Sequence, residues 1–182
     1  VISFACSERI KKLCGHYGLP VQITKVGFKY ICEIMNTEDV LVGGEESGGI
    51  AVKGHIPERD GIWCGLLLME FLAETGRSLQ ELIQEVYDIV GPFHFRRDDL
   101  HIDEAVQQNV VKKCRDKAFK VFGSYKITRT EDLDGYKFYV SEDSWLMIRP
   151  SGTEPVLRIY AEADNEEETG RLLAACKQTI LG

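Results

Sequence analysis

The sequence lacks several features that would each indicate a particular class of protein. Its most apolar run, residues 66–71, is far shorter than the ~20 residues that span a membrane, and no secretion signal is visible. The six cysteines are scattered without a Cys-x-x-Cys pair, which argues against a metal site and a disulfide framework. The net charge of −7, without a basic stripe, argues against nucleic acid. We therefore expect a cytoplasmic protein with no nucleic-acid or membrane partner.

A short segment near the end of the chain groups two arginines, two hydroxyl groups and a glycine. These residues are Arg149, Ser151, Gly152, Thr153 and Arg158. Guanidinium groups match phosphate oxygens and keep their charge, hydroxyls add donors, and a glycine lets backbone N–H groups approach an anion. The pattern predicts a phosphate-binding loop. Turn chemistry also explains the prolines and the glycine, as a hairpin loop with solvated charges.

Alternating apolar residues on both sides of this segment predict a β-hairpin. The two strands would cover residues 145–149 and 156–162. If Arg149 pairs opposite Val156, then Met147 pairs opposite Arg158. Because side chains alternate across a strand, both arginines would then lie on one face of the hairpin.

A second segment, residues 43–49, reads GGEESGG between two short apolar runs that we expect to be strands, 40–42 and 50–52. Four glycines indicate a loop whose backbone closely approaches another group. Ionised carboxylates accept hydrogen bonds and donate none, so Glu45 and Glu46 suit sugar hydroxyls and not phosphates.

Together, the two loops resemble those of the α-D-phosphohexomutases, the phosphoglucomutase and phosphomannomutase family. The resemblance implies that Glu45 and Ser47 contact the sugar, and that the five residues of the first segment hold the substrate phosphate. A third segment, VGFKY at residues 26–30, is similar to the family segment that carries a substrate-contacting lysine, here Lys29.

Two of the sugar-site candidates have a second interpretation. Lys29 is either a substrate ligand or a solvated charge. His55, in GHIPERDG at residues 54–61, is either a neutral donor to the sugar or a structural loop histidine.

Two family motifs do not occur in the sequence. The family's phosphorylated serine, in a Ser-His-Asn-Pro setting, and its Asp-x-Asp-x-Asp magnesium loop belong to its first and second domains. The resemblance thus implies a C-terminal fragment with domains 3 and 4, with no catalytic residue and no metal ligand of its own. A valine at position 1 agrees with a fragment. We expect it to be inactive alone.

The resemblance implies a function for the longer protein. It would be an intramolecular phosphotransferase that interconverts hexose 1-phosphate and hexose 6-phosphate, through a phosphoserine and a bisphosphorylated sugar. Its Mg²⁺ would be bound by an absent domain, and its partners would be the phosphorylated hexose and the missing N-terminal domains. Glucose, mannose, glucosamine and pentose substrates stay open. The alternative is a stand-alone, non-catalytic phosphosugar-binding module.

The chain also divides into two expected domains. Residues 1–90 alternate strands and helices, which predicts an α/β domain with parallel strands, and its N-terminus could be incomplete. Helices are expected at 7–17, 60–74 and from a capping box that begins at Ser78. Gly91 and Pro92 mark the boundary. For residues 91–182 we expect an α+β domain, with an antiparallel four-stranded sheet covered on one face by two helices.

Overall fold

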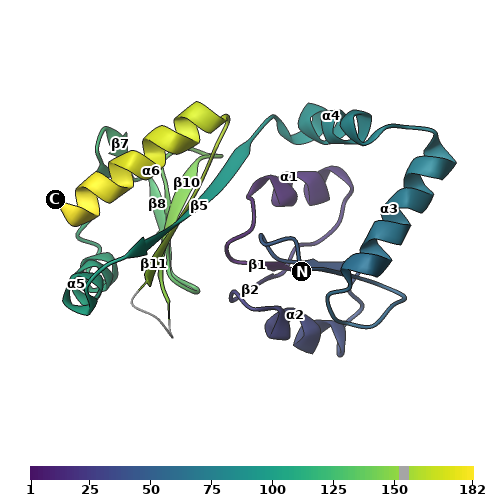
Figure 1. Cartoon of the computed structure of the whole chain (residues 1–182), viewed down its shortest axis with the longest axis horizontal. Helices are drawn as coiled ribbons and strands as arrows, with labels where there is room; N and C mark the ends of the chain where they lie inside the picture. Colours follow the sequence, from purple (N-terminus) through teal and green to yellow (C-terminus); the bar gives the residue numbers. More distant parts are fainter. Residues whose placement is uncertain (152–155) are drawn as a thin grey trace. The chain divides into compact units, whose positions relative to one another are not determined.

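The computed structural model describes residues 1–151 and 156–182. The chain forms two compact units, Val1–Gly91 and Pro92–Gly182 (Figure 1). Each unit has its own sheet and helices. None of the helices among the described residues is long and apolar enough to cross a membrane.

The first unit contains a small mixed sheet. Its strands are β1 (Ile2–Ser3), β2 (Ile23–Thr24), β3 (Val42–Gly44) and β4 (Ile50–Val52). In this fully described unit the strand order is β2-β1-β3-β4. Strand β1 runs parallel to β2 and β3, as predicted, whereas β4 is antiparallel to β3. The connection between β3 and β4 is a tight hairpin, too short for the crossover that a parallel pair needs.

Strand β3 corrects the expected boundaries of the glycine-rich segment. The predicted strand 40–42 is shifted toward the C-terminus, so that Gly43 and Gly44 belong to β3 and the loop starts at Glu45. Gly43 is buried against helix α2 (Phe28–Met35), where an added Cβ would lie 2.3 Å from Cγ2 of Ile31. Two of the four glycines therefore belong to the strand: Gly43 allows close packing against α2, and Gly44 is the last residue of β3.

Helices α1 (Arg9–His16) and α2 lie on opposite sides of the sheet (Figure 1). Helix α2 closes a small core in which Phe28 and Ile31 pack with Ala51 of β4. On the other side, Nη1 of Arg9 donates a hydrogen bond of 2.7 Å to the carbonyl of Val90, which ends helix α4 (Leu79–Val90).

Helix α3 (Gly61–Thr75) agrees with the predicted helix 60–74 to within one residue. Its first residue follows Asp60, whose side chain accepts from the backbone N–H of Trp63, and it ends at Gly76 in the left-handed conformation. None of its side chains is buried, and large apolar groups such as Ile62, Leu66 and Met69 are exposed.

The second unit is built on an antiparallel sheet. Its elements are β5 (His94–His101), α5 (Glu104–Arg115), β6 (Val121–Phe122), β7 (Tyr125–Lys126), β8 (Arg129–Glu131), β9 (Tyr136–Tyr139), β10 (Trp145–Pro150), β11 (Val156–Ala163) and α6 (Glu166–Leu181). Among the described residues the order in the sheet is β5-β11-β10-β9-β8, with β6 and β7 as a separate pair.

The expectation of four strands was therefore wrong, because the sheet described here has five. Strand β8, with the sequence Arg-Thr-Glu, lies at the edge of the sheet and has the weakest strand pattern of the five. An edge strand of polar residues has no apolar alternation for the pattern to detect.

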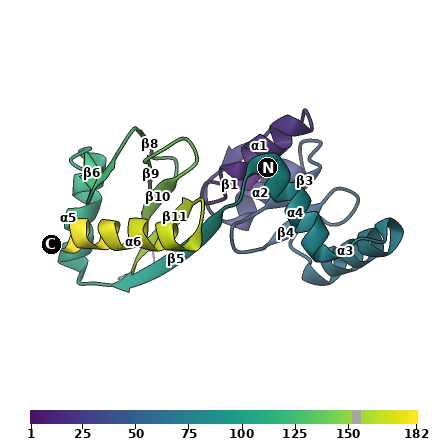
Figure 2. The ribbon, with the colours of Figure 1, turned by 90° about the horizontal axis from the view of Figure 1, so that it is seen from above.

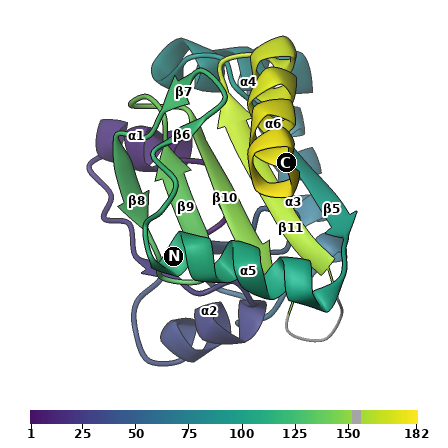
Figure 3. The ribbon, with the colours of Figure 1, turned by 90° about the vertical axis from the view of Figure 1, so that its left-hand side faces the viewer.

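Helices α5 and α6 lie on the same face of this sheet, and α6 packs along β11 and β5 (Figure 2 and Figure 3). Beneath them, Leu146, Ile148 and Ile159 form the centre of the core. The helix-facing side of β10 and β11 is thus fixed by these apolar residues. Residues of the opposite parity, including Arg149 and Arg158, are directed to the other face.

Candidate functional site

The three parallel strands of the first unit end at the same edge of the sheet. Ser3 of β1 is paired with Thr24 of β2, and Ile2 with Gly44 of β3. Ligands of α/β sheets bind beyond the carboxyl ends of parallel strands. The loops that begin after Thr24 and Gly44 carry Lys29 and the Glu45–Ser47 segment, so the fold brings the predicted sugar-contacting segments to one edge.

The loop after β3 is a tight turn. The backbone N–H of Glu45 donates to the carbonyl of Gly49 at 2.9 Å, and that of Gly48 donates to the carbonyl of Glu45 at 3.1 Å. Gly48 has a φ of +86°, which favours glycine. A Cβ at Gly49 would lie 2.5 Å from Cδ of Arg59, so the arginine side chain would have to move. The tip of the turn, Ser47 and Gly48, is exposed.

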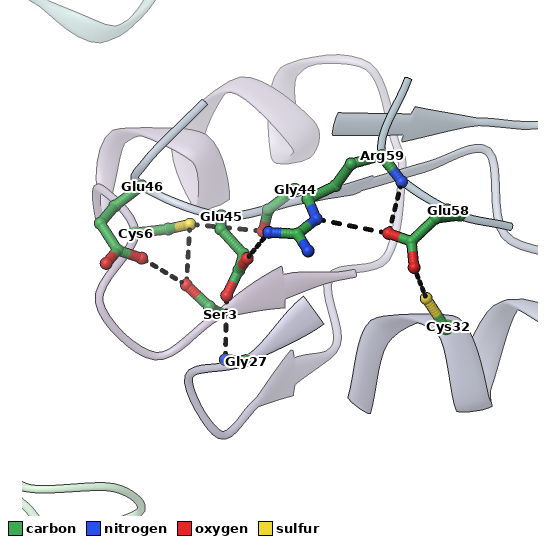
Figure 4. A network of polar contacts seen from close by, with 9 residues as sticks. All are labelled: Ser3, Cys6, Gly27, Cys32, Gly44, Glu45, Glu46, Glu58 and Arg59. Atoms are coloured by element: carbon green, nitrogen blue, oxygen red, sulfur yellow. Dashed lines mark hydrogen bonds and ion pairs between the residues drawn. The ribbon is translucent and has the colours of Figure 1, made fainter. Parts of the chain in front are cut away.

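Glu45 is largely buried, with 8% of its side chain exposed. Its Oε1 accepts a 2.9 Å hydrogen bond from the backbone N–H of Gly27, and its Oε2 lies 4.0 Å from Nη1 of Arg59 (Figure 4). Gly27 immediately precedes α2, and the negative charge of Glu45 is favourable at that helix N-terminus. This carboxylate therefore connects the loop to the start of the helix that carries Lys29.

Lys29 is the second residue of α2 and is exposed. Its Nζ lies 4.8 Å from the ring centroid of Tyr30. The ammonium group is thus available at the same edge as the loop.

His55 is bound to the start of α3. Its Nε2 lies 2.9 Å from Oδ2 of Asp60, and its ring stacks on Trp63 with centroids 4.7 Å apart. The backbone N–H of Trp63, and then His55, lower the pKa of the Asp60 carboxyl from its usual value. These contacts support the structural interpretation of this histidine, and its contact with sugar stays a prediction.

In the second unit, Arg149 of β10 is directly opposite Arg158 of β11. The predicted pairing of Arg149 with Val156 was wrong by two residues, because the hairpin turns one residue further along the chain than assumed. A shift of two residues keeps the parity, so the expectation that both arginines share one face is confirmed. Residues directly opposite have Cβ atoms about 4.5–5.5 Å apart, and like charges in such a pair destabilise the sheet.

The two guanidinium groups have different surroundings. Nε of Arg149 lies 3.2 Å from Oδ2 of Asp134, and both side chains are about one-fifth exposed. Nε of Arg158 is buried and has no hydrogen-bond partner among the described residues. The backbone N–H of Ser151 donates to the carbonyl of Val156.

Two predicted phosphate ligands, Gly152 and Thr153, lie outside the described residues.

Sequence reasoning missed the role of Asp134. It occurs in an Asp-Gly turn, and the turn is a detectable signal. Its contact with Arg149 is not detectable from spacing, because the two residues meet through the pairing of β9 with β10. Among the described residues no group of three His, Cys, Asp or Glu side chains could hold a metal ion.

Comparison with known families matches both units. The model of phosphoglucomutase/phosphomannomutase, alpha/beta/alpha domain III, matches residues 1–90, and that of the phosphoglucomutase/phosphomannomutase C-terminal domain matches residues 102–178. The chain belongs to the phosphoglucomutase/phosphomannomutase family.

Curated relatives agree with this membership. A phosphoglucomutase/phosphomannomutase of Thermococcus kodakarensis is 31% identical over 95% of this chain, and a phosphoglucosamine mutase of Rubrobacter xylanophilus is 34% identical over 94% of it. The chain spans only 36% and 35% of their lengths. It therefore corresponds to the C-terminal part of these phosphohexomutases.

Solved structures share the fold. One from Thermus thermophilus, described as a putative phosphomannomutase, is 32% identical with a TM-score of 0.78, and the match covers 100% of this chain and 36% of that one. Parafusin, a phosphoglucomutase from Paramecium, matches 98% of this chain and 37% of its own with a TM-score of 0.76 and 19% identity, which shows the fold alone.

Proposed function

We propose that this chain is the substrate-binding C-terminal part of a phosphohexomutase that interconverts hexose 1-phosphate and hexose 6-phosphate. The reaction would proceed through a phosphoserine, which would lie in another part of the protein, and through a bisphosphorylated sugar formed when that serine transfers its phosphoryl group to the substrate. Mg²⁺ would be bound by another domain of the protein. We place the enzyme in the cytoplasm.

The observation that carries this proposal is the pair of arginines on adjacent strands. Two arginines directly opposite each other on adjacent strands repel, although Asp134 contacts Arg149 and Asp99 of β5 is opposite Arg158. The buried Nε–H of Arg158 is a donor without an acceptor among the described residues, and such a group is costly unless a ligand satisfies it. A phosphate dianion would relieve both problems, with charge-assisted hydrogen bonds from both side chains.

The chemistry of the other loop suits the rest of the substrate. Glu45 retains acceptor capacity beyond its bond to Gly27, since a carboxylate offers about four lone-pair sites, and the exposed Ser47 and Lys29 provide further hydrogen-bonding groups. We propose that these groups bind sugar hydroxyls while the arginines hold the phosphate. Their contribution to catalysis would be positioning and charge stabilisation, which dominate phosphoryl transfer.

Two orientations of the sugar must bind during one cycle, because a phosphoryl group leaves one end and returns at the other. The arginines would hold whichever phosphate does not react, and the loop would contact hydroxyls common to both orientations. The named relatives act on glucose, mannose and glucosamine phosphates, and we propose a hexose phosphate of this class as substrate.

Titration of the chain with inorganic phosphate and with glucose 6-phosphate tests the proposal. Arg149→Ala and Arg158→Ala should each weaken both ligands about tenfold or more, since a hydrogen bond to a charged group contributes about 1.5–3 kcal/mol. Arg171→Ala is the matched control, because this exposed arginine pairs with Glu167 and Glu168 on its own helix, α6. Equal affinities for all three variants and the unmodified chain would refute the phosphate site.

A further inference from the structure

The glycine-rich turn carries two adjacent carboxylates, and the structure directs them to different partners. Glu45 points to Gly27 at the start of α2, whereas Glu46 points to Ser3 at the end of β1 (Figure 4). Family resemblance gives Glu46 no function. Its contact with Ser3 therefore calls for a separate explanation.

Ser3 is a buried hydroxyl group, with 1% of the residue exposed. Its Oγ donates a 2.9 Å hydrogen bond to Oε2 of Glu46. A buried hydroxyl without a partner costs free energy, and a hydrogen bond to an ionised acceptor is stronger than a neutral one. Each group therefore holds the other in place: Glu46 satisfies Ser3, and Ser3 fixes the side chain of Glu46.

A second contact joins the same two segments. Sγ of Cys6, which lies 3.4 Å from Oγ of Ser3, donates to the carbonyl of Gly44 at 3.6 Å. Residues 44 and 46 are thus both attached to the end of β1 and the turn that follows it. The next residue, Ser47, is at the exposed tip, followed by Gly48 with its positive φ.

We infer that Glu46 is a positioning residue, which fixes the turn through Ser3 so that Ser47 and Glu45 are held ready for the sugar. This inference rests on the proposed function. Groups that contact a substrate must be held within about 0.5 Å of their productive position by supporting contacts. Without Glu46, the tip of this turn would be mobile, because the turn contains two glycines. Each binding event would then have to order Ser47, which costs free energy.

The test is a double-mutant cycle on the affinity of the chain for glucose 6-phosphate. Glu46→Ala and Ser3→Ala should each weaken it about tenfold, and the double variant should be no weaker than either single one, because both remove the same contact. Affinity for inorganic phosphate should stay unchanged in all three. Glu46→Gln should restore binding, because its amide oxygen still accepts from the Ser3 hydroxyl.

Three results would overturn the inference. Additive losses in the cycle would mean that Ser3 and Glu46 act independently. If Glu46→Gln is as weak as Glu46→Ala while Ser3→Ala binds normally, then Glu46 contacts the ligand itself. Equal loss of phosphate and sugar-phosphate affinity would mean that the contact serves only general folding.

Ser47→Ala and Arg149→Ala separate failure of this inference from failure of the proposed function. If these two variants weaken glucose 6-phosphate and Glu46→Ala does not, the site stands and the positioning role is wrong. If none of the variants changes binding, or if the unmodified chain does not bind glucose 6-phosphate, the proposed function fails and the inference fails with it.

Discussion

Gly135 shows how closely a single residue can be constrained beside the proposed phosphate site. Its φ is +92°, and a Cβ at this position would lie 2.9 Å from the carbonyl oxygen of Ile148 and 3.0 Å from Cβ of Arg149. Both facts exclude a side chain. The Asp134–Gly135 corner is therefore packed against the strand that carries Arg149, which explains how Asp134 reaches this arginine.

Gly135→Ala should accordingly reduce the free energy of unfolding of the second unit by about 1–3 kcal/mol, the usual cost of a strained backbone. The matched control is Gly170→Ala in α6, where an added Cβ meets nothing within 4 Å. That substitution should be stabilising by about 0.4–1 kcal/mol. Chemical denaturation of both variants checks the pair, and a neutral Gly135→Ala would contradict the packing described here.

Burial also determines which thiols can react. Desolvation raises the pKa of Cys114 to about 12 and raises that of Cys176 as well. The thiolate is the reactive form, so both residues should resist iodoacetamide at about pH 8, near the usual thiol pKa, in the folded chain. The partly exposed Cys14 and Cys64 should be alkylated first. Peptide mapping by mass spectrometry checks this order, which should disappear in denaturant.

Residue patterns predicted which strand faces carry the candidate site residues better than they predicted the contacts of those residues. Alternation along two strands was enough to put Arg149 and Arg158 on one face, because the period of two is a local property. The partners of Glu45 and Glu46 were not predictable, since Gly27 and Ser3 reach them only through the order of strands in the sheet. The exact pairing of the arginines depended on where the hairpin turns, which the alternation does not specify.

Among the elements, helix α4 has the clearest local determinant. The Ser78 side chain accepts from the backbone N–H of Glu81, and the Glu81 carboxylate accepts from the backbone N–H of Ser78. Ser78→Ala should destabilise the first unit by about 1 kcal/mol, as loss of an N-cap typically does. Thermal unfolding checks this, with the exposed Gln80→Ala as control.

The same capping box gives a pH dependence. Hydrogen bonds from the backbone and then the side chain of Ser78 lower the pKa of Glu81. A lowered folded-state pKa means that the contact stabilises the helix above the unfolded pKa and that this contribution is lost as the pH falls through the folded pKa. The stability difference between the unmodified chain and Glu81→Gln should therefore shrink below about pH 4. A constant difference across pH would contradict this role.

Helices with capping residues at their ends were predicted well, as were the two strands with a clear apolar alternation, β10 and β11. Asp60, Gly76 and Ser78 mark helix ends by side-chain chemistry that operates locally, so α3 and the start of α4 were found to within a residue. Strand β8 has no such signal. It forms because β9 offers an edge, which is a property of the sheet and not of the three residues themselves.

For the whole molecule, we expect the chain by itself to have no mutase activity. It contains neither the Ser-His-Asn-Pro segment nor the Asp-x-Asp-x-Asp loop of the family, and it spans about a third of the length of its relatives. A coupled assay with glucose 1-phosphate and Mg²⁺ should show no turnover above that of a preparation of Arg149→Ala. Turnover that this substitution abolishes would show that the chain contains its own phosphoryl acceptor.

The exposed apolar side chains of helix α3 predict how self-association of the chain depends on temperature. Ile62, Met69 and Leu66 present 81%, 66% and 54% of their surface to solvent, on a helix with no buried side chain. Attraction between apolar surfaces is mainly entropic near room temperature and weakens on cooling. Solutions of the chain should thus be most resistant to self-association in the cold. Covering α3 with any apolar surface would appear in calorimetry as a negative change in heat capacity.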